Sequence, residues 1–169
     1  MVVTGALVLL RGELRDFQSY GYLGAFVISL LSSATIIVPV PGLAVVFALG
    51  GLLNPFFVGI ASGAGEPFGE LTGYMAGRGG HVAFKIRNGH RYEKIEGWMR
   101  RRGMLLVFLT SSFPNPVFDL IGAAAGAIKM PLWKFILACW AGKTIKGVGI
   151  ALAGYFGLRF FLNLFGVSL

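Results

Sequence analysis

Glu66 and Glu70 are the residues of this sequence best suited to do chemistry, because they lie four positions apart in a stretch that otherwise predicts a membrane helix. Positions four apart share one face of an α-helix. A charged side chain at the centre of a bilayer costs about 2.5 to 3.5 kcal/mol on insertion scales, so acidic residues there need a functional explanation. Both cannot be ionised without partners, which makes the pair a candidate proton or cation site.

Lys143 and Lys146 are the simplest electrostatic partners for the two glutamates. They lie three positions apart in the second apolar half, so they also share a helical face. We predict that they pair with the glutamates, and both a functional polar pathway and a structural ion pair fit such an arrangement. Asn115 offers an amide at a predicted hairpin tip, and Asp119 could cap the following half-helix or line the same pathway.

The sequence lacks the residue patterns of an enzyme or a metalloprotein. Cys139 is the only cysteine, which excludes an intramolecular disulfide and a thiolate metal cluster. Neither His81 nor His90 has a metal-ligand spacing, and no histidine lies near Ser111 or Ser112 in the sequence to act as a base. We therefore expect no enzyme activity, no cofactor and no metal site.

The composition is typical of a polytopic membrane protein. Of 169 residues, 56% are hydrophobic and 13% are charged, whereas about 25% are charged in a soluble domain. Residues 17–65 contain no Asp, Glu, Lys or Arg, and as a single helix they would far exceed a hydrocarbon core of about 30 Å. We expect a multi-pass membrane location, which would be the cytoplasmic membrane in a prokaryote.

The net charge of +8 is concentrated between the two apolar halves. Residues 78–102 carry eight Lys or Arg and two Glu, so the positive-inside rule places this loop in the cytoplasm. Tyr92, Ile95, Trp98 and Met99 recur at helical spacing and predict an amphipathic helix on anionic lipid, although a plain topology signal explains the loop equally well. We expect no nucleic-acid partner, because the charge serves the membrane.

Two proline pairs interrupt the apolar halves at corresponding places, Pro39 with Pro41 and Pro114 with Pro116. An α-helix does not continue through them, because proline lacks a backbone donor and restricts the residue before it. We predict an all-α polytopic membrane protein built as an inverted repeat, each half being a re-entrant helical hairpin plus a transmembrane helix. Ordinary spans kinked at the prolines are the alternative.

This repeat divides the chain into predicted segments. We expect one membrane domain over residues 20–158, with an interfacial segment at 1–19 before it and a tail at 159–169 after it. Within the domain we expect, in order, a re-entrant hairpin at 20–54, a crossing helix at 55–80, a basic amphipathic loop at 81–103, a second hairpin at 104–129 and a crossing helix at 131–158. Glycines spaced four apart predict close helix packing along two ridges, at Gly65, Gly69, Gly73 and Gly77, and at Gly122 and Gly126.

The chain resembles the DedA and VTT superfamily of membrane proteins, also known as the SNARE-associated Golgi protein family, over about residues 20–157. The first half is similar at Pro39-Val40-Pro41-Gly42, at Gly69-Glu70-Leu71-Thr72-Gly73-Tyr74 and at Gly77-Arg78. The second half, at Ser112-Phe113-Pro114-Asn115-Pro116-Val117-Phe118-Asp119 with Gly142-Lys143 downstream, is similar to the branch containing the eukaryotic vacuole membrane protein. The resemblance implies that Glu70 is the motif acid and Arg78 the motif arginine.

The resemblance also implies movement of lipids between leaflets, with membrane phospholipids as partners and a homo-oligomer left open. The eukaryotic branch is associated with phospholipid scrambling, and the bacterial proteins with flipping carriers such as undecaprenyl phosphate. Leu43, Ser111 and Val117 stand where the DedA pattern has an acid and two arginines. We therefore expect an energy-independent phospholipid scramblase, with a proton- or Na⁺-coupled carrier flippase and a membrane scaffold as alternatives.

Overall fold

The computed structural model describes residues 19–34, 42–79, 97–114 and 117–164, and these residues form helices and no strand. This confirms the all-α prediction for the described part of the chain. The helical segments are Ser19–Ala34, α2 (Gly42–Leu52), α3 (Pro55–Gly79), residues 97–111, α5 (Val117–Ala127) and α6 (Leu132–Leu164).

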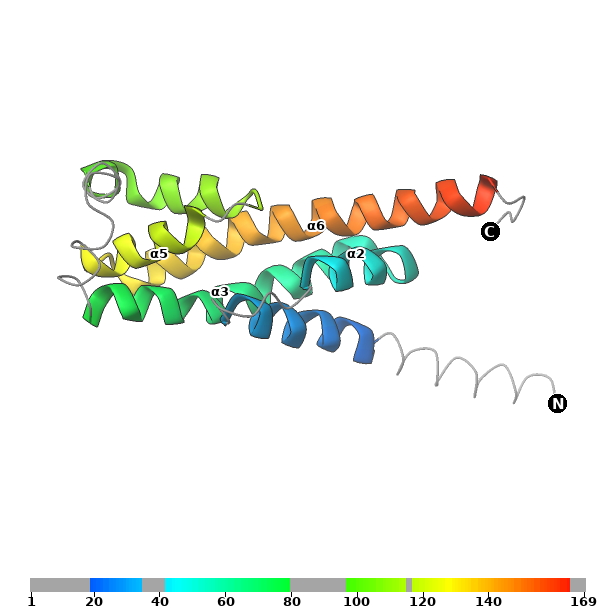
Figure 1. The fold of residues 1–169 in the computed structure, drawn as a ribbon, viewed down its shortest axis with the longest axis horizontal. Helices are drawn as coiled ribbons and strands as arrows, with labels where there is room; N and C mark the ends of the chain where they lie inside the picture. The colour runs from blue at the N-terminus through cyan, green and yellow to red at the C-terminus, as the bar shows by residue number, and fades with distance from the viewer. Residues whose placement is uncertain (1–18, 35–41, 80–96, 115–116, 165–169) are drawn as a thin grey trace.

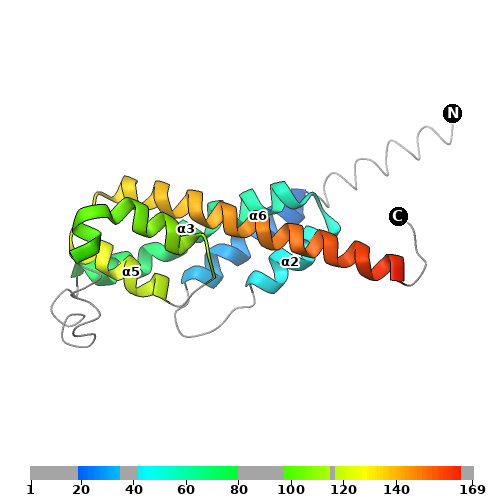
Figure 2. The ribbon, with the colours of Figure 1, turned by 90° about the horizontal axis from the view of Figure 1, so that it is seen from above.

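Two long helices, α3 and α6, run antiparallel along the length of the molecule and contact each other (Figure 1). Four shorter helices lie beside them as two antiparallel pairs. Ser19–Ala34 and α2 form the pair near the two chain ends, and residues 97–111 and α5 form the pair at the other end (Figures 1 and 2). Helix α2 contacts α6, whereas α5 contacts α3.

The break between α2 and α3 is shorter than the glycines suggest. Helix α2 continues through Gly50 and Gly51, because both glycines lie against α6, where a side chain on Gly50 would collide with the backbone of Ala151. Asn54 then starts α3: its Oδ1 accepts a hydrogen bond of 3.0 Å from the backbone N–H of Phe56, which is an N-cap.

Helix α5 ends in a Schellman motif, which makes the tight turn into α6. The backbone N–H of Met130 donates to the carbonyl of Ala125 at 3.0 Å, and that of Lys129 donates to the carbonyl of Gly126 at 2.9 Å. Lys129 has a φ of 57°, a left-handed conformation in which glycine is the usual residue. The hydroxyl of Tyr74 on α3 donates to the carbonyl of Met130 at 2.5 Å and so fixes the turn to the bundle.

The long glycine ridge of α3 serves two separate interfaces. Side chains on Gly65 or Gly69 would collide with the helix Ser19–Ala34, whereas one on Gly77 would collide with Ala123 of α5. A side chain on Gly73 would meet no atom of the described residues within 4 Å. The predicted close helix packing is therefore present at Gly65, Gly69 and Gly77, but two different helices share the long ridge.

Two predicted boundaries also shift. Residues 97–111 form one helix across the boundary expected at residue 103, because Met99 is buried in the core and packs near Met130 rather than lying on lipid. Helix α6 continues beyond residue 158 to Leu164. Of the predicted interfacial segment 1–19, residues 1–18 lie outside the described residues. The same is true of residues 80–96, which include most of the predicted basic loop 81–103, and of residues 165–169, Pro39, Pro41, Asn115 and Pro116.

The distribution of polarity is that of a membrane protein. Large apolar side chains such as Phe57, Phe156 and Phe160 are exposed, whereas the charged residues Glu66, Glu70 and Lys143 are buried in the bundle. In the described residues, α6 is the one helix long and apolar enough to span a bilayer. Its 33 residues measure about 50 Å, which exceeds a hydrocarbon core of about 30 Å.

Candidate functional site

A polar cavity of about 390 Å³ lies inside the bundle, where the described ends of the two helix pairs approach α3 and α6. Ser32, Ser33 and Gly42 line it from the first pair, and Phe113 and Pro114 line it from the second. Among the described residues, its charged lining consists of three carboxylates and two ammonium groups, from Glu66, Glu70, Asp119, Lys143 and Lys146.

Lys143 lies at the centre of the charged group. Its Nζ atom is 2.6 Å from Oε1 of Glu70 and 3.0 Å from Oε2 of Glu66. The same Nζ atom lies 4.5 Å from the centre of the Phe118 ring, which is a cation–π distance. Lys143 therefore joins the carboxylates of α3 to an aromatic ring of α5, and its own exposed fraction is 7%.

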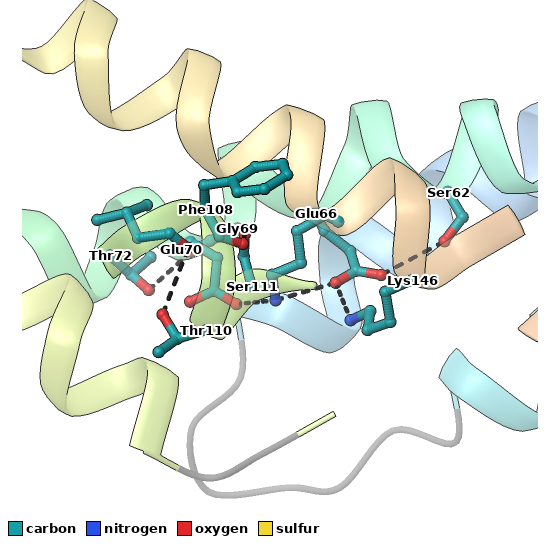
Figure 3. A network of polar contacts seen from close by, with 11 residues as sticks. Ser62, Glu66, Gly69, Glu70, Thr72, Phe108, Thr110, Ser111 and Lys146 are labelled. Carbon is teal, nitrogen blue, oxygen red and sulfur yellow. Dashed lines mark hydrogen bonds and ion pairs between the residues drawn. The ribbon is translucent and has the colours of Figure 1, made fainter. Parts of the chain in front are cut away.

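Lys146 and two serines extend this group toward the first helix pair. The Nζ atom of Lys146 donates to Oε2 of Glu66 at 2.5 Å. The hydroxyl of Ser62 donates to Oε1 of Glu66 at 3.4 Å, and the hydroxyl of Ser29 donates to that of Ser62 at 2.9 Å. Figure 3 shows Glu66 held between Ser62 and Lys146. The polar contacts thus connect the helix Ser19–Ala34 with α3 and α6.

Glycines bring the backbones of α3 and α6 close enough for these contacts. A side chain on Gly63 would collide with Thr144, and one on Gly59 would collide with Val148. Pro67 lies within α3 between the glutamates and has no backbone N–H, so the carbonyl of Gly63 loses its helical donor. The hydroxyl of Thr144 is buried without a hydrogen-bond partner within the described structure.

The four buried charges balance one another. Glu66, Glu70 and Lys143 are each less than a tenth exposed, and an isolated charge in such a position would be strongly destabilising. The predicted pairing of the two lysines with the two glutamates is present. Asp119 is exposed and lines the same cavity, where it forms no ion pair with a described residue.

Three of the motif residues, Tyr74, Gly77 and Arg78, do not line the cavity. Arg78 donates through Nη1 to the hydroxyl of Tyr74 at 3.2 Å, and Tyr74 in turn bonds to Met130. This places Tyr74 and Arg78 in the packing of the α5–α6 turn, with Gly77 against α5 nearby. Gly69 instead lies against the helix Ser19–Ala34. Pro114 lines the cavity, whereas Asn115 lies outside the described residues.

Sequence reasoning missed three residues of the site, Ser29, Ser62 and Phe118. Ser62 had a signal, because it lies four positions before Glu66 and so shares its helical face. Phe118 belongs to a quoted motif beside Asp119, but nothing in the sequence indicated its contact with Lys143, and Ser29 had no signal in its apolar segment. Within the described residues, no group of three His, Cys, Asp or Glu could hold a metal ion.

Comparisons with known proteins give a consistent result. A family model of the VTT domain matches residues 40–156. The chain is 33% identical to vacuole membrane protein KMS2 of Arabidopsis thaliana over 110 residues, which are 60% of this chain and 25% of that protein. It is 29% identical to inner membrane protein YqaA of Escherichia coli (strain K12) over 115 residues, which are 68% of this chain and 77% of that protein.

The similarity to the longer relatives is confined to part of their length. Vacuole membrane protein 1 of Homo sapiens is 25% identical over 104 residues, which are 49% of this chain and 26% of that protein. The matched region thus spans about a quarter of these vacuole membrane proteins. No solved structure matches the chain. The family match covers more than half of the sequence, and this membrane protein therefore belongs to the VTT domain family, which includes the DedA proteins.

Proposed function

We propose that this protein lets phospholipid headgroups cross the bilayer through its central cavity without an energy source. The observation that carries this proposal is that charged side chains lie inside the bundle at the cavity and apolar side chains lie outside, which is the reverse of a soluble protein. Among the described residues, five charged side chains line a cavity between the helices, whereas large apolar side chains are exposed on the outer surface. A polar headgroup could enter such a cavity while its acyl chains stay in lipid.

We further propose that the two helix pairs are re-entrant hairpins of an inverted repeat. The first helices of the two pairs support this, because they use equivalent contacts. Gly65 of α3 lies against the backbone of Phe26, and Gly142 of α6 lies against the backbone of Phe108. Each long helix thus has a glycine that lets the first helix of its own half approach closely.

The second helices of the two pairs also support the repeat, because each contacts the long helix of the other half. A side chain on Gly77 of α3 would collide with Ala123 of α5, and one on Gly154 of α6 would collide with Phe47 of α2. Gly77 and Gly154 have the same sequence separation as Gly65 and Gly142. Because the pairs approach from opposite ends of the molecule, their tips would meet near the middle of the bilayer (Figure 1).

The charges of the cavity fit a headgroup that carries both signs. The phosphate of a phospholipid would compete with Glu66 and Glu70 for Lys143 and Lys146, and the amine of the headgroup would take the released carboxylates. Phe118 would add a cation–π contact to a choline or ethanolamine group. Exchange of partners keeps every buried charge paired during the passage, which lowers the barrier.

The direct test uses liposomes that contain the purified protein and a fluorescent phospholipid, with dithionite added outside. Protein-free vesicles lose about half of the signal, because dithionite reaches only the outer leaflet. We expect vesicles with the protein to lose nearly all of it. A trace that stops at the protein-free level would contradict the proposal, provided the reconstituted protein is monodisperse after re-extraction.

A cavity variant and a control variant distinguish a loss of scrambling caused by the cavity from a loss that any substitution could cause. Glu70→Leu combined with Lys143→Met removes one charge of each sign, so the net charge of the cavity lining does not change, and Lys146 can still pair with Glu66. We expect this double variant to scramble at least about tenfold more slowly, which corresponds to about 1.4 kcal/mol of barrier. Arg159→Gln, an exposed position near the other end of α6, should scramble like the wild type. Equal rates in all three proteins would contradict a role for the cavity.

A coupled flippase of a lipid carrier is the second candidate, and Asp119 favours it. This carboxylate is exposed, lines the cavity and lacks an ion pair among the described residues, so it could take a proton or Na⁺. Coupled transport predicts accumulation on one side under an imposed gradient, and an ionophore would abolish it. Scrambling predicts equal distribution and no effect of the ionophore.

A further inference from the structure

A second groove, of about 620 Å³, lies at the end of the bundle away from the chain termini, between the helix of residues 97–111 and the α5–α6 turn. Its charged lining is entirely basic among the described residues, and includes Arg101, Arg102, Lys129 and Lys134. None of these four forms an ion pair with a described residue. This contrasts with the central cavity, where both lysines pair with carboxylates.

Backbone contacts fix the positions of these basic residues. The Schellman motif holds Lys129 at the turn, and the carbonyl of Pro131 accepts a hydrogen bond of 3.0 Å from the backbone N–H of Lys134. The ammonium group of Lys134 lies 5.4 Å from the centre of the Trp133 ring. An anion bound between these basic side chains would be favoured, because opposite charges attract and none of the four has an ion-pair partner among the described residues.

An apolar groove of about 420 Å³ adjoins the basic groove and shares Arg101, Arg102 and Leu105 with it. Leu106 and Leu109 continue it along the helix. A hydrocarbon chain could lie on this surface while a charged group attached to it reaches the arginines. The two grooves together therefore have the polarity of a lipid, with a charged end and an apolar end.

Trp98 lies in the same apolar groove, with 65% of its surface exposed. It precedes Arg101, Arg102 and Leu105 at helical spacing, so these side chains share one face of the helix. Tryptophan and arginine are typical of the level of the lipid headgroups in a membrane. Along this face of the helix, side chains suited to the headgroup level are followed by apolar ones, which matches the order of headgroup and acyl chain in a lipid.

We propose that these joined grooves bind one anionic phospholipid, with its phosphate between Arg101, Arg102, Lys129 and Lys134 and an acyl chain along Leu105 and Leu109. Basic pockets between helices on the cytoplasmic side of membrane proteins are suited to such headgroups. The lipid would join the helix of residues 97–111 to the α5–α6 turn. It would be a bound lipid and not the transported one, since it lies outside the central cavity, and the proposal does not depend on scrambling.

The test uses fluorescence of Trp98 in the full-length protein. The chain has three tryptophans, so Trp133→Phe with Trp140→Phe leaves Trp98 as the reporter. Phosphatidylglycerol with a brominated acyl chain, mixed into neutral detergent micelles, should quench Trp98 at a mole fraction at least about tenfold lower than brominated phosphatidylcholine does. Equal quenching by the two lipids would overturn the proposal.

A second reporter controls for lipid that merely coats the protein. Trp98→Phe with Trp133→Phe leaves Trp140, which is exposed on α6 away from both grooves. Its quenching should be the same with either lipid. If Trp140 shows the same preference for phosphatidylglycerol, the preference belongs to the whole basic protein and the site is refuted.

Variants and a soluble competitor test the two ends of the lipid separately. Arg101→Gln with Arg102→Gln should remove the preference for phosphatidylglycerol at Trp98, and Arg159→Gln should leave it unchanged. If the double arginine variant does not fold, Lys134→Gln alone should weaken the preference several-fold. Glycerol phosphate should not displace the brominated lipid at equal concentration, and displacement would show a phosphate site without a lipid chain, contrary to the proposal.

Discussion

The Nζ atom of Lys143 lies 2.6 Å from Oε1 of Glu70, although the two residues are 73 positions apart in the sequence. Each belongs to a different half of the chain, and neither is more than 7% exposed. A buried ion pair of this kind adds little stability compared with a well-packed apolar pair, but the loss of one partner leaves a buried charge. The pair therefore holds α3 against α6, because moving the helices apart would leave two buried charges without partners.

Lys143→Met should destabilise the protein by about 3 to 5 kcal/mol, because it leaves Glu70 without a cation. Adding Glu70→Leu should recover much of this loss, since no unpaired charge remains at that position. Thermal unfolding in detergent, followed by loss of the monodisperse peak, measures the four corners of this double-mutant cycle. Additive losses would show that the two residues do not interact.

Gly77→Ala and Gly73→Ala should have opposite effects, although both lie on α3. A side chain at Gly77 would collide with the backbone of Ala123, so helix α5 must move and the protein should lose about 1 to 3 kcal/mol. Gly73 has no atom near its potential side chain, so alanine should stabilise the helix by up to about 1 kcal/mol. Comparison of the two melting temperatures in the same detergent checks this, and equal shifts would contradict it.

Thr144→Val should be neutral or should stabilise the protein by about 1 kcal/mol. It replaces a buried hydroxyl without a described partner by a methyl group of similar size. Ser62→Ala is the comparison, because it removes the hydroxyl that bonds to Ser29 and Glu66 and should cost about 1 kcal/mol. Loss of stability in Thr144→Val would mean that its hydroxyl has a partner in the membrane, such as a bound water.

Lys129→Gly should stabilise the α5–α6 turn by about 1 kcal/mol, because glycine has no steric penalty at a φ of 57°. Lys129→Ala removes the same charge and keeps the strained conformation, so the difference between the two variants isolates the backbone effect. Thermal unfolding of both in neutral detergent measures it. If the alanine variant is as stable as the glycine variant, the turn relaxes out of this conformation.

Electrostatics was the part of the site that could be predicted from the sequence. Within the predicted membrane helices, Glu66 and Glu70 had few basic residues available as partners, so Lys143 and Lys146 followed from the need to balance buried charge. The same reasoning could not find Ser29 or locate the cavity. Neutral polar residues carry no comparable constraint, and a serine in an apolar helix can bond to its own backbone.

The sequence predicted that helices pack closely at the glycines of α3, but it did not predict which helices make these contacts. The glycines of α3 correctly indicated close contacts, yet Gly65 and Gly77 contact different helices and Gly73 contacts none. A spacing of four residues gives the face of a helix, whereas the helix that covers the face depends on crossing angles set by the whole bundle. For the same reason the helix across residue 103 was missed, because burial of Met99 depends on distant Met130.

The separation of the charges between the two halves of the chain determines which halves can assemble. The first half contributes Glu66 and Glu70 to the buried cluster, and the second contributes Lys143 and Lys146. Two copies of the first half would place four carboxylates together, and two copies of the second would place four ammonium groups together. Only unlike halves neutralise each other, so the cluster disfavours self-pairing of either half.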